Sequence, residues 1–444
     1  MSKRSFLTHF ARQYLDTLNL RRFFGDYRTF DFDPDYFHLG IGEIANIIDH
    51  PTWQSLIHDF YADQRLVSRA TMYSGTRGER EANQALADHL GNLLDRPEIG
   101  EQHIIPYDGG HNAISGIVRA CLAPIGDRDE KRQYALLPTP CYPYFPTIIT
   151  QHSGVLAYLA YDAEEMVQGI ENLINPQIGV VLLNTPHNPT GYSLAPEQVT
   201  RINQALAPYD CILVVDMVYA MNALDTNAIR ALGGFDPERT IYVDSFSKKF
   251  GLPGFRLGFT ACTNVELVEA LRMMKAAESV SASNVKFLFA AHLLQHHMNL
   301  AETTAATIRQ RYQIFHQALS GIEEYGVELP PQTGNTNTFY LPLFLDRLLA
   351  RSGLTAEEFT TICHQQYHLE VVPGTRMYPP EKLPSGQLAI EKGSVRITTP
   401  EPVVYAPDFA KRKQPFIRLS FGIEHRVDEA AKQLRQACAA IFTI

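Results

Sequence analysis

The stretch of sequence with the clearest chemical potential runs from Ser245 to Gly258. It places Lys248 and Lys249 after two serines, and Arg256 follows among several glycines. Glycine lets a backbone approach a ligand closely, and hydroxyl groups with an arginine suit a phosphate monoester. A lysine held among such groups can form a Schiff base with an aldehyde. Taken alone, the stretch is more typical of a solvated Lys248-Lys249 pair beside a glycine turn.

An acidic residue stands where an apolar run ends, upstream of the lysine stretch. Val214 and Val215 lead directly to Asp216, and Tyr219 follows shortly after. The carboxyl ends of strands in an open parallel sheet are where ligands bind. Burial of a carboxylate there costs free energy through desolvation unless a cation, such as a protonated pyridine nitrogen, pairs with it. Asp216 alone fits a helix N-cap or an ordinary salt bridge equally well.

A third block follows another apolar run, Ile178–Asn184. It reads Asn-Thr-Pro-His-Asn-Pro-Thr-Gly and offers the side chain of Asn188 as a hydrogen-bond donor. A simple Asn-Pro turn explains this block as well, and a cis Pro189 would redirect the chain sharply.

Taken in this order and spacing, the three blocks resemble the class I/II aminotransferases, which are fold-type I enzymes that use pyridoxal 5′-phosphate (PLP). The resemblance extends from about Leu39 to Gly422. It implies an α/β protein of the PLP-dependent transferase fold, with a mainly parallel central sheet in a large domain and a smaller α+β domain. It also implies a PLP-dependent aminotransferase, which moves an amino group between an L-amino acid and a 2-oxo acid.

The resemblance assigns roles to residues of the three blocks. Lys248 matches the lysine that binds PLP covalently, and Asp216 matches the carboxylate that keeps the pyridine nitrogen protonated. Asn188 and Tyr219 match the pair that hydrogen-bonds the phenolic oxygen of PLP. Tyr142 resembles the aromatic residue stacked on the ring, although an aromatic residue of the core or of a turn fits there too. Lys248, Asp216 and Tyr219 are therefore the expected catalytic residues.

A glycine-rich turn supplies the expected phosphate site. Gly109-Gly-His-Asn opens the helix expected over Ala113–Leu122, so backbone N–H groups and the helix dipole favour an anion there. The resemblance makes the following residues ligands of the PLP phosphate: Gly110, His111, Asn112, Ser245, Ser247 and Arg256. Tyr73 resembles the tyrosine that reaches the phosphate of the neighbouring subunit, which implies a homodimer with a shared active site.

Substrate binding is expected around Arg418. Its guanidinium matches the group that grips the substrate α-carboxylate in a bidentate fork, whereas the alternative is an ion pair with an acid of the small domain. Gly42 resembles the glycine beside the bound carboxylate, and Asn188 is expected to contact the substrate as well. No second arginine can be assigned to a dicarboxylate side chain, so an aspartate substrate is not implied.

The chain departs from the family pattern between Gly374 and Arg418, where it is longer than usual. Residues 377–413 are rich in proline and are expected to form a long irregular insertion that remodels the substrate entrance. His292 and His296 stand about one helical turn apart, but no third ligand accompanies them. No metal site is therefore expected.

Elements that could position these residues alternate along the middle of the chain. Short β-branched runs predict strands at Ala135–Leu137, Ile178–Asn184, Cys211–Val215, Thr240–Val243 and Leu257–Ala261. Helical patterns lie between them, including Ala113–Leu122 and Pro196–Leu206. Continuous apolar strands fit a parallel sheet that is covered on both faces, so the alternation predicts an α/β domain.

The second half of the chain changes pattern. Residues 265–320 are almost wholly helical in pattern and are long enough for two helices. The expected strands Thr338–Pro342 and Phe416–Ser420 and a closing helix near Val427–Ile441 come after them. The 444 residues therefore divide, in prediction, into an N-terminal arm that joins the small domain (1–50), a large PLP-binding domain (51–300) and a small C-terminal domain (301–444).

Composition and charge bear on the partners and the location of the protein. The chain has 39 Lys and Arg against 48 Asp and Glu, a net charge of −9, which argues against a nucleic-acid partner. No apolar stretch is long enough to span a membrane, and the N-terminus lacks a signal-peptide pattern. Six widely separated cysteines in mostly apolar settings predict reduced thiols and a cytoplasmic location.

Two other functions stay open from the sequence alone. The same scaffold could run a lyase, cyclase, decarboxylase or oxidase reaction on a free amino acid, because PLP labilises several bonds at Cα. A non-catalytic PLP-binding domain of a regulator is the other alternative. The first 50 residues are too few and not basic enough for the DNA-binding module that such a protein carries.

Overall fold

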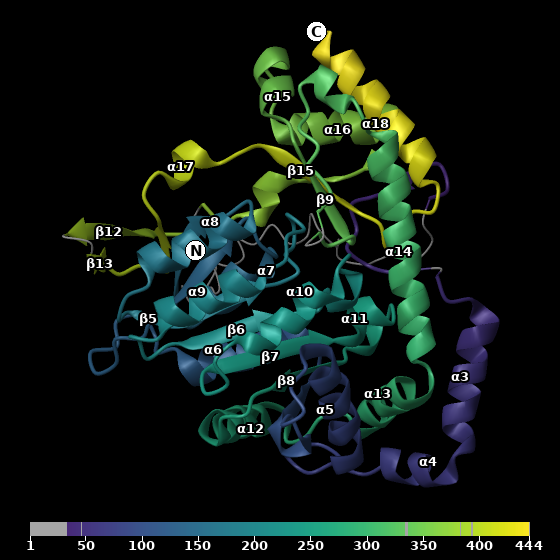
Figure 1. Ribbon diagram of the computed structural model, residues 1–444, viewed down its shortest axis with the longest axis vertical. Helices are drawn as coiled ribbons and strands as arrows, with labels where there is room; N and C mark the ends of the chain where they lie inside the picture. Colours follow the sequence, from purple (N-terminus) through teal and green to yellow (C-terminus); the bar gives the residue numbers. More distant parts are fainter. Residues whose placement is uncertain (1–32, 46, 334–335, 382, 392–393, 444) are drawn as a thin grey trace, which may run out of the picture.

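The computed structural model describes residues 33–45, 47–333, 336–381, 383–391 and 394–443. The N-terminal stretch in which no signal peptide is expected lies outside these residues, so that expectation is not tested. Within them, no helix is both long and apolar enough to cross a membrane. Figure 1 shows a large part built around a wide sheet and a smaller part that lies above it in this view.

A ten-stranded sheet forms the centre of the large part, with the strand order β13-β12-β14-β4-β3-β5-β6-β7-β8-β2. From β12 to β7 every neighbouring pair is parallel, and β8 and β2 close one edge in antiparallel pairing. In this order the strands are β13 (Ser394–Thr399), β12 (Ser385–Glu391), β14 (Val403–Tyr405), β4 (Gly154–Leu159), β3 (Tyr134–Thr139), β5 (Ile178–Asn184), β6 (Ile212–Asp216), β7 (Thr240–Ser245), β8 (Gly258–Ala261) and β2 (Ile104–Tyr107). The α/β prediction and the five strands predicted in this region are confirmed, whereas β2 and β4 were not predicted.

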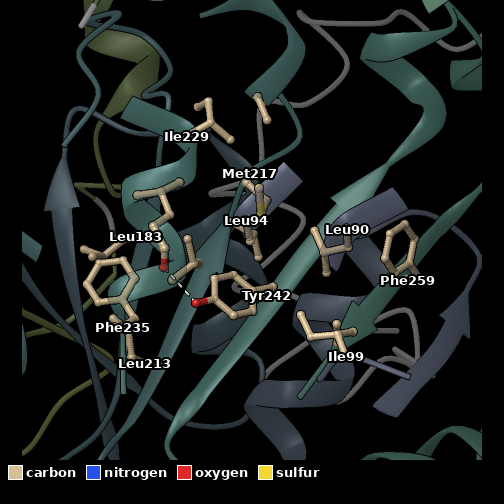
Figure 2. Close-up of a cluster of buried hydrophobic side chains, with 14 of the residues drawn as sticks. Leu90, Leu94, Ile99, Leu183, Leu213, Met217, Ile229, Phe235, Tyr242 and Phe259 are labelled. Carbon is tan, nitrogen blue, oxygen red and sulfur yellow. Dashed lines mark hydrogen bonds between the residues drawn. The ribbon is translucent and has the colours of Figure 1, made fainter. Parts of the chain in front are cut away.

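The inner strands are apolar throughout because both faces of the sheet are covered. Successive side chains of a strand point to opposite faces, so Leu183 of β5 joins one hydrophobic cluster and Leu182 joins another. Figure 2 shows Leu183 in the first cluster together with Leu90 and Leu94. The first face is covered mainly by α5 (Arg80–Leu94), α8 (Ala163–Leu173), α9 (Pro196–Leu206), α10 (Thr226–Ala231) and α13 (Asn284–His296), and the second by α6 (Gly110–Cys121), α7 (Tyr144–Thr150) and α12 (Val265–Ser279).

The smaller part contains a three-stranded antiparallel sheet with the order β11-β15-β9. Its elements are β9 (Tyr340–Phe344), β11 (Val372–Pro373), β15 (Phe416–Ser420), α14 (Met298–Ala318), α15 (Asp346–Ser352), α16 (Ala356–Tyr367) and α18 (Val427–Phe442). Phe37, Leu39 and Ile44 from near the N-terminus belong to the same hydrophobic cluster as these elements. β1 (Phe37–His38) pairs in parallel with β10 (Leu369–Glu370), which ties this N-terminal segment to the smaller part.

The long helical stretch after β8 contains three helices, α12, α13 and α14, where two were expected. Val280 follows α12 with a left-handed backbone (φ 60°), and His297 separates α13 from α14. Neither break is marked by proline or glycine in the sequence. Because the hydrophobic pattern continues across both breaks, the sequence does not indicate where these helices end.

Residues 377–413 form regular structure, which corrects the prediction of an irregular insertion. They contain β12 (Ser385–Glu391), β13 (Ser394–Thr399), β14 (Val403–Tyr405) and α17 (Phe409–Arg412). Because β14 pairs in parallel with β4, these strands widen the large sheet, at the left of Figure 1. The prolines stand outside the strands, and in β13 buried Val395 and Ile397 alternate with exposed neighbours. The domain boundaries at residues 50 and 300 stay predictions.

Candidate active site

A cavity of about 870 Å³ lies at the carboxyl ends of the parallel strands, between the large sheet and the smaller part. Ligands of open α/β sheets bind at this edge. The cavity brings together most of the site residues predicted from the sequence: Gly42, Gly110, His111, Tyr142, Asp216, Tyr219, Ser245, Ser247, Lys248, Arg256 and Arg418. Residues that lie far apart in the chain therefore meet at one place.

Three predicted site residues do not line the cavity. Asn188 is buried next to it, where its side-chain oxygen accepts a hydrogen bond from Arg418 (3.3 Å) and its Nδ2 donates to the hydroxyl of Tyr219 (3.5 Å). Asn112 is exposed on the first turn of α6. Tyr73 is 90% exposed in the loop before α5. The roles of these residues stay predictions, and the role of Tyr73 requires a second subunit.

Lys248 faces the cavity from α11 (Phe246–Lys249), the short helix that follows β7. Its ammonium donates a hydrogen bond to the backbone carbonyl of Gly42. Burial lowers the pKa of Lys248 to about 8, and the positive charges of Arg418 and Arg256 act in the same direction. A fraction of this lysine is therefore neutral near pH 7, and the neutral amine is the form that attacks an aldehyde.

Asp216 ends β6 and lines the cavity. Its Oδ1 accepts a hydrogen bond from the backbone N–H of Val218 (3.3 Å), and no salt bridge joins it to another described residue. Burial raises the pKa of Asp216 from its ordinary value of 3.8 to about 7, and the charge of Asp244 adds to the rise. A cation placed against Asp216, such as a protonated ring nitrogen, would favour the ionised carboxylate.

Ser245, Ser247 and Arg256 lie beside the start of α6 and form a cradle for an anion. The two serine hydroxyl oxygens are 3.0 Å apart. A Cβ atom on Gly258 would lie 2.5 Å from the backbone carbon of Gly109, and a Cβ atom on Gly109 would lie 2.5 Å from a terminal nitrogen of Arg256. Glycine is therefore needed for β8 and the guanidinium to approach this turn. Hydroxyls, a guanidinium and helix N-terminal N–H groups together fit a phosphate monoester.

His111 and Tyr142 form another wall of the cavity. The ring of His111 packs edge-on against Tyr144, with centroids 5.5 Å apart. Burial lowers the pKa of His111, and the charge of Arg256 adds to this effect, which favours a neutral imidazole. Tyr142 packs against Tyr144 and Phe145, so its position fits both the predicted stacking role and the alternative of a core aromatic.

Sequence reasoning missed Tyr340, which begins β9 and lines the cavity. Its hydroxyl oxygen is 3.0 Å from that of Tyr219, and its ring centroid is 4.4 Å from the guanidinium carbon of Arg418. A Cβ atom on Gly42 would clash with the Tyr340 hydroxyl, which explains the need for glycine at that position. No sequence motif marks Tyr340, because only the pairing of β9 with β15 brings it to the cavity.

Arg418 is 4% exposed and lies on β15, the middle strand of the small sheet. Its terminal nitrogens donate to the backbone carbonyl of Gly40 (2.8 Å) and to the side-chain oxygen of Asn188 (3.3 Å). Its Nε is buried without a hydrogen-bond partner. Within the described part of the chain no carboxylate forms a salt bridge with Arg418, so the alternative of a structural ion pair is not observed there. A buried guanidinium with unused donors beside a cavity fits a carboxylate ligand.

The outer wall of the cavity comes from the smaller part and was not predicted. It includes Thr360, Thr361 and His364 of α16, together with Arg376. On the same side His38 Nδ1 lies 2.6 Å from Glu370 Oε2. Burial acts to lower the pKa of His38, but the hydrogen bond and the charge of Glu370 outweigh it and raise this pKa. The sequence carries no local signal for this wall, because its residues stand in no recognisable motif.

His292 and His296 of α13 lie together with their ring centroids 5.1 Å apart, and His297 Nε2 is 3.3 Å from His292 Nε2. In the described part of the chain, no group of three or more His, Cys, Asp and Glu residues is arranged to hold a metal ion.

Comparison with known proteins identifies the family. The family model for aminotransferase class I and II matches residues 35–402. The chain belongs to the class I and II aminotransferases. It is 25% identical over 349 residues to an aspartate aminotransferase of Pyrococcus abyssi, which covers 77% of this chain and 84% of that protein. It is also 25% identical over 349 residues to aromatic-amino-acid aminotransferase 2 of Thermococcus litoralis, over 76% of this chain and 82% of that protein.

Solved structures agree on the fold. YbdL from Escherichia coli, described with a methionine aminotransferase function, matches 98% of this chain and 100% of its own, with a TM-score of 0.70 and 18% identity. An aromatic aminotransferase from Pyrococcus horikoshii matches over 92% of this chain and 97% of its own, with a TM-score of 0.69 and 21% identity. The fold-type I prediction is therefore confirmed.

The family membership decides between the functions left open by the sequence. This protein is an aminotransferase, and the class I and II family uses PLP. The lyase, cyclase, decarboxylase and oxidase alternatives are not favoured, because the similar proteins are named for amino-group transfer.

Proposed function

We propose that this aminotransferase holds PLP in the 870 Å³ cavity and that Lys248 is the lysine that binds it. The observation that carries the proposal is the position of the Lys248 amine, in a cavity lined by the buried carboxylate of Asp216 and by an anion cradle. These two features suit the ring nitrogen and the phosphate of one PLP molecule. When bound, PLP supplies an electron sink that labilises the bonds at Cα of an amino acid.

The residues around the ring have separate tasks in this proposal. Asp216 would hold the proton on the ring nitrogen through an ion pair, and Tyr219 and Asn188 would hold the phenolic oxygen by hydrogen bonds. Tyr142 would lie against the ring. The phosphate would be held by Ser245, Ser247, Arg256 and the N-terminal turn of α6, where Gly110, His111 and Asn112 stand.

Lys248 and Arg418 act on the amino acid substrate. With a pKa of about 8, the Nζ of Lys248 can both accept and release a proton near neutral pH, so it can take the proton from the substrate Cα. Arg418 grips the α-carboxylate with its unused N–H donors, while Gly40 and Asn188 fix the plane of the guanidinium. The same groups then serve a 2-oxo acid in reverse, which completes amino-group transfer.

A homodimer with a shared active site is part of the proposal. Tyr73 is 90% exposed and its neighbour Met72 is 69% exposed, which supports a second subunit at this loop. We expect Tyr73 to reach the phosphate of the partner subunit. Light scattering during size exclusion should give a dimer, and Tyr73→Phe should weaken PLP binding. A monomer with full activity would contradict this part of the proposal.

A cytoplasmic location is also proposed. All six cysteines are free thiols, and five of them are buried. Reduced, unpaired thiols support a reducing compartment. Fractionation of the native host should recover the enzyme with cytoplasmic markers, and recovery with membranes or the exterior would contradict the proposal.

Borohydride reduction of the PLP-loaded enzyme tests the role of Lys248 directly. Reduction fixes the cofactor to the lysine that carries it, and fragment mass spectra distinguish Lys248 from Lys249. We expect the added mass on Lys248, and no covalent label in Lys248→Ala. Lys275→Met is the matched control, because Lys275 is a buried lysine of α12 outside the cavity and should leave labelling unchanged. A label on another lysine of the wild type would overturn the proposal.

Turnover tests the reaction itself. A panel of L-amino acids, including aspartate, tyrosine and methionine, is supplied with 2-oxoglutarate, and amino acid and oxo acid products are measured. We expect stoichiometric transfer that Lys248→Ala abolishes. Sustained turnover without any 2-oxo acid acceptor would contradict amino-group transfer.

A further inference from the structure

Lys249 directly follows the lysine of the proposed site, but its surroundings are entirely different. Lys249 is 2% exposed and does not line the cavity. Its ammonium donates hydrogen bonds to Oδ2 of Asp244 and to Nε2 of His89, the latter over 2.6 Å. The interpretation of Lys248 and Lys249 as a solvated pair is therefore wrong.

Asp244, Lys249 and His89 form a buried triad that joins three elements. Asp244 lies on β7, Lys249 ends α11, and His89 lies on α5. Because the ammonium can only donate, His89 accepts through Nε2 and carries its proton on Nδ1. Burial and the charge of Lys249 hold the pKa of His89 well below its ordinary value, in agreement with a neutral imidazole. The triad therefore consists of one ion pair, between Lys249 and Asp244, and the neutral His89, which accepts a hydrogen bond from Lys249.

Stability alone does not explain this arrangement. A buried ion pair can often be replaced by apolar residues of similar volume without loss of stability. The feature that the triad controls is the orientation of α11, which has only four residues and cannot sustain a helix by itself. Neighbouring residues of a helix point roughly 100° apart, because a turn holds about 3.6 residues. Holding Lys249 against β7 and α5 therefore turns Lys248 toward the cavity.

The triad also reaches the anion cradle through its carboxylate. Oδ1 of Asp244 accepts a hydrogen bond from the backbone N–H of Ser245 (2.7 Å). The hydroxyl oxygen of Ser245 in turn accepts from the backbone N–H of Ser247 (3.2 Å) and lies 3.0 Å from the Ser247 hydroxyl. Lys249 therefore fixes the position of both serines through Asp244.

We propose that Lys249 is a positioning residue, which holds α11 against Asp244 and His89 so that the two serines and Lys248 meet the cofactor together. The inference rests on the proposed function, because it concerns how the same site takes PLP. Its specific consequence is that phosphate recognition depends on Lys249. Pyridoxal has the ring and the aldehyde of PLP but lacks the phosphate, so it does not need the serines.

The test compares the affinity of the apoenzyme for PLP and for pyridoxal. Both are measured by absorbance titration in the wild type and in Lys249→Met. We expect Lys249→Met to bind PLP about tenfold more weakly or worse, which is the size of one lost charge-assisted hydrogen bond. Pyridoxal affinity should fall by a smaller factor, because pyridoxal depends on the orientation of Lys248 but not on the serines, so the ratio of PLP to pyridoxal affinity should fall. If the ratio of PLP to pyridoxal affinity in Lys249→Met equals that of the wild type, the inference is overturned.

Other variants separate positioning from folding. If Lys249→Met does not fold, His89→Leu is measured in its place, because it removes only the neutral acceptor and keeps the ion pair. We expect His89→Leu to lower the ratio of PLP to pyridoxal affinity and His89→Gln, which keeps an acceptor, to restore it. An unchanged ratio in His89→Leu would count against the inference.

The matched control is Lys275→Met. Lys275 is 3% exposed, and its amine has no hydrogen-bond partner among the described residues. The ratio of PLP to pyridoxal affinity in Lys275→Met should equal that of the wild type. A fall of this ratio in Lys275→Met as large as in Lys249→Met would mean that removal of any buried lysine has this effect. Failure of the wild type itself to prefer PLP over pyridoxal would instead refute the proposed function.

Discussion

The buried carboxylate of Asp216 should make the apoenzyme less stable as the pH rises, and Asp216→Asn should remove this effect. The folded protein raises the pKa of Asp216 from 3.8 to about 7. Between these two values the folded state binds a proton that the unfolded state has released. Stability contributed by the neutral carboxyl is therefore present at low pH and is lost as the pH rises through about 4 to 7.

The size of the effect follows from the shift in pKa. The rise in pKa from 3.8 to about 7 corresponds to about 4 kcal/mol of unfolding free energy once the carboxyl is fully ionised. Roughly half of this penalty is present at pH 5.5. The unfolding free energy of Asp216→Asn relative to that of the wild type should therefore increase by about 2 kcal/mol between pH 5.5 and pH 8.5. Asparagine keeps an oxygen that can accept from Val218. Asp244 and Lys248, the charged groups that act on Asp216, are unchanged in the variant.

Urea unfolding of the two apoenzymes at pH 5.5 and pH 8.5 measures the difference. Asp210→Asn is the control for the substitution itself, because Asp210 is exposed and does not line the cavity. A stability difference between Asp216→Asn and the wild type that is the same at both pH values would refute the reasoning. The added PLP should reduce the penalty in the wild type, because its ring nitrogen supplies a cation at this position.

Three further predictions concern the cradle, the substrate arginine and the lysine. Gly258→Ala should weaken PLP binding by about tenfold or more in absorbance titrations, because its Cβ would lie 2.5 Å from the backbone of Gly109, and unchanged affinity would show that the cradle can open. Arg418→Gln should raise the KM for the amino acid by about tenfold or more in steady-state kinetics while PLP affinity stays the same, and a loss of PLP affinity instead would place the arginine in cofactor binding. Covalent attachment of pyridoxal to the apoenzyme should accelerate as the pH rises, with a midpoint near 8, because the neutral amine of Lys248 attacks, and a midpoint near 10 would contradict the lowered pKa.

Much of the fold and the site could be predicted because both depend on local patterns. The inner strands are apolar on both faces, so Ile178–Asn184 stands out in the sequence and is found unchanged as β5. Asp216 and Ser245 end such strands, and a parallel sheet brings its strand ends to one edge. The position of these residues at the same edge of the sheet therefore follows from the strand assignments alone.

The residues that were missed depend on contacts between distant segments. Tyr340 meets Tyr219 only because the small sheet packs over the large one, and no local pattern encodes this packing. The strands of the insertion escape prediction because the proline-rich composition indicates an irregular loop, whereas the prolines all stand outside the short strands. Alternation in Ser394–Thr399 was visible in the sequence and could have identified β13.

Charge connects these observations into one account of the site. Lys248, Arg256 and Arg418 line the same cavity although the whole chain has a net charge of −9, and the two arginines contribute to the lowered pKa of the lysine. Asp216 lies among the same walls and has its pKa raised mainly by burial. Without a ligand, the cavity therefore disfavours the charged forms of both Lys248 and Asp216. A ligand that is anionic at the cradle and cationic at Asp216 would relieve both costs at once, and PLP with a protonated ring has this distribution of charge. Binding of PLP should for this reason increase the free energy of unfolding. A ligand that has only a phosphate, or only a cationic ring, should stabilise the protein less.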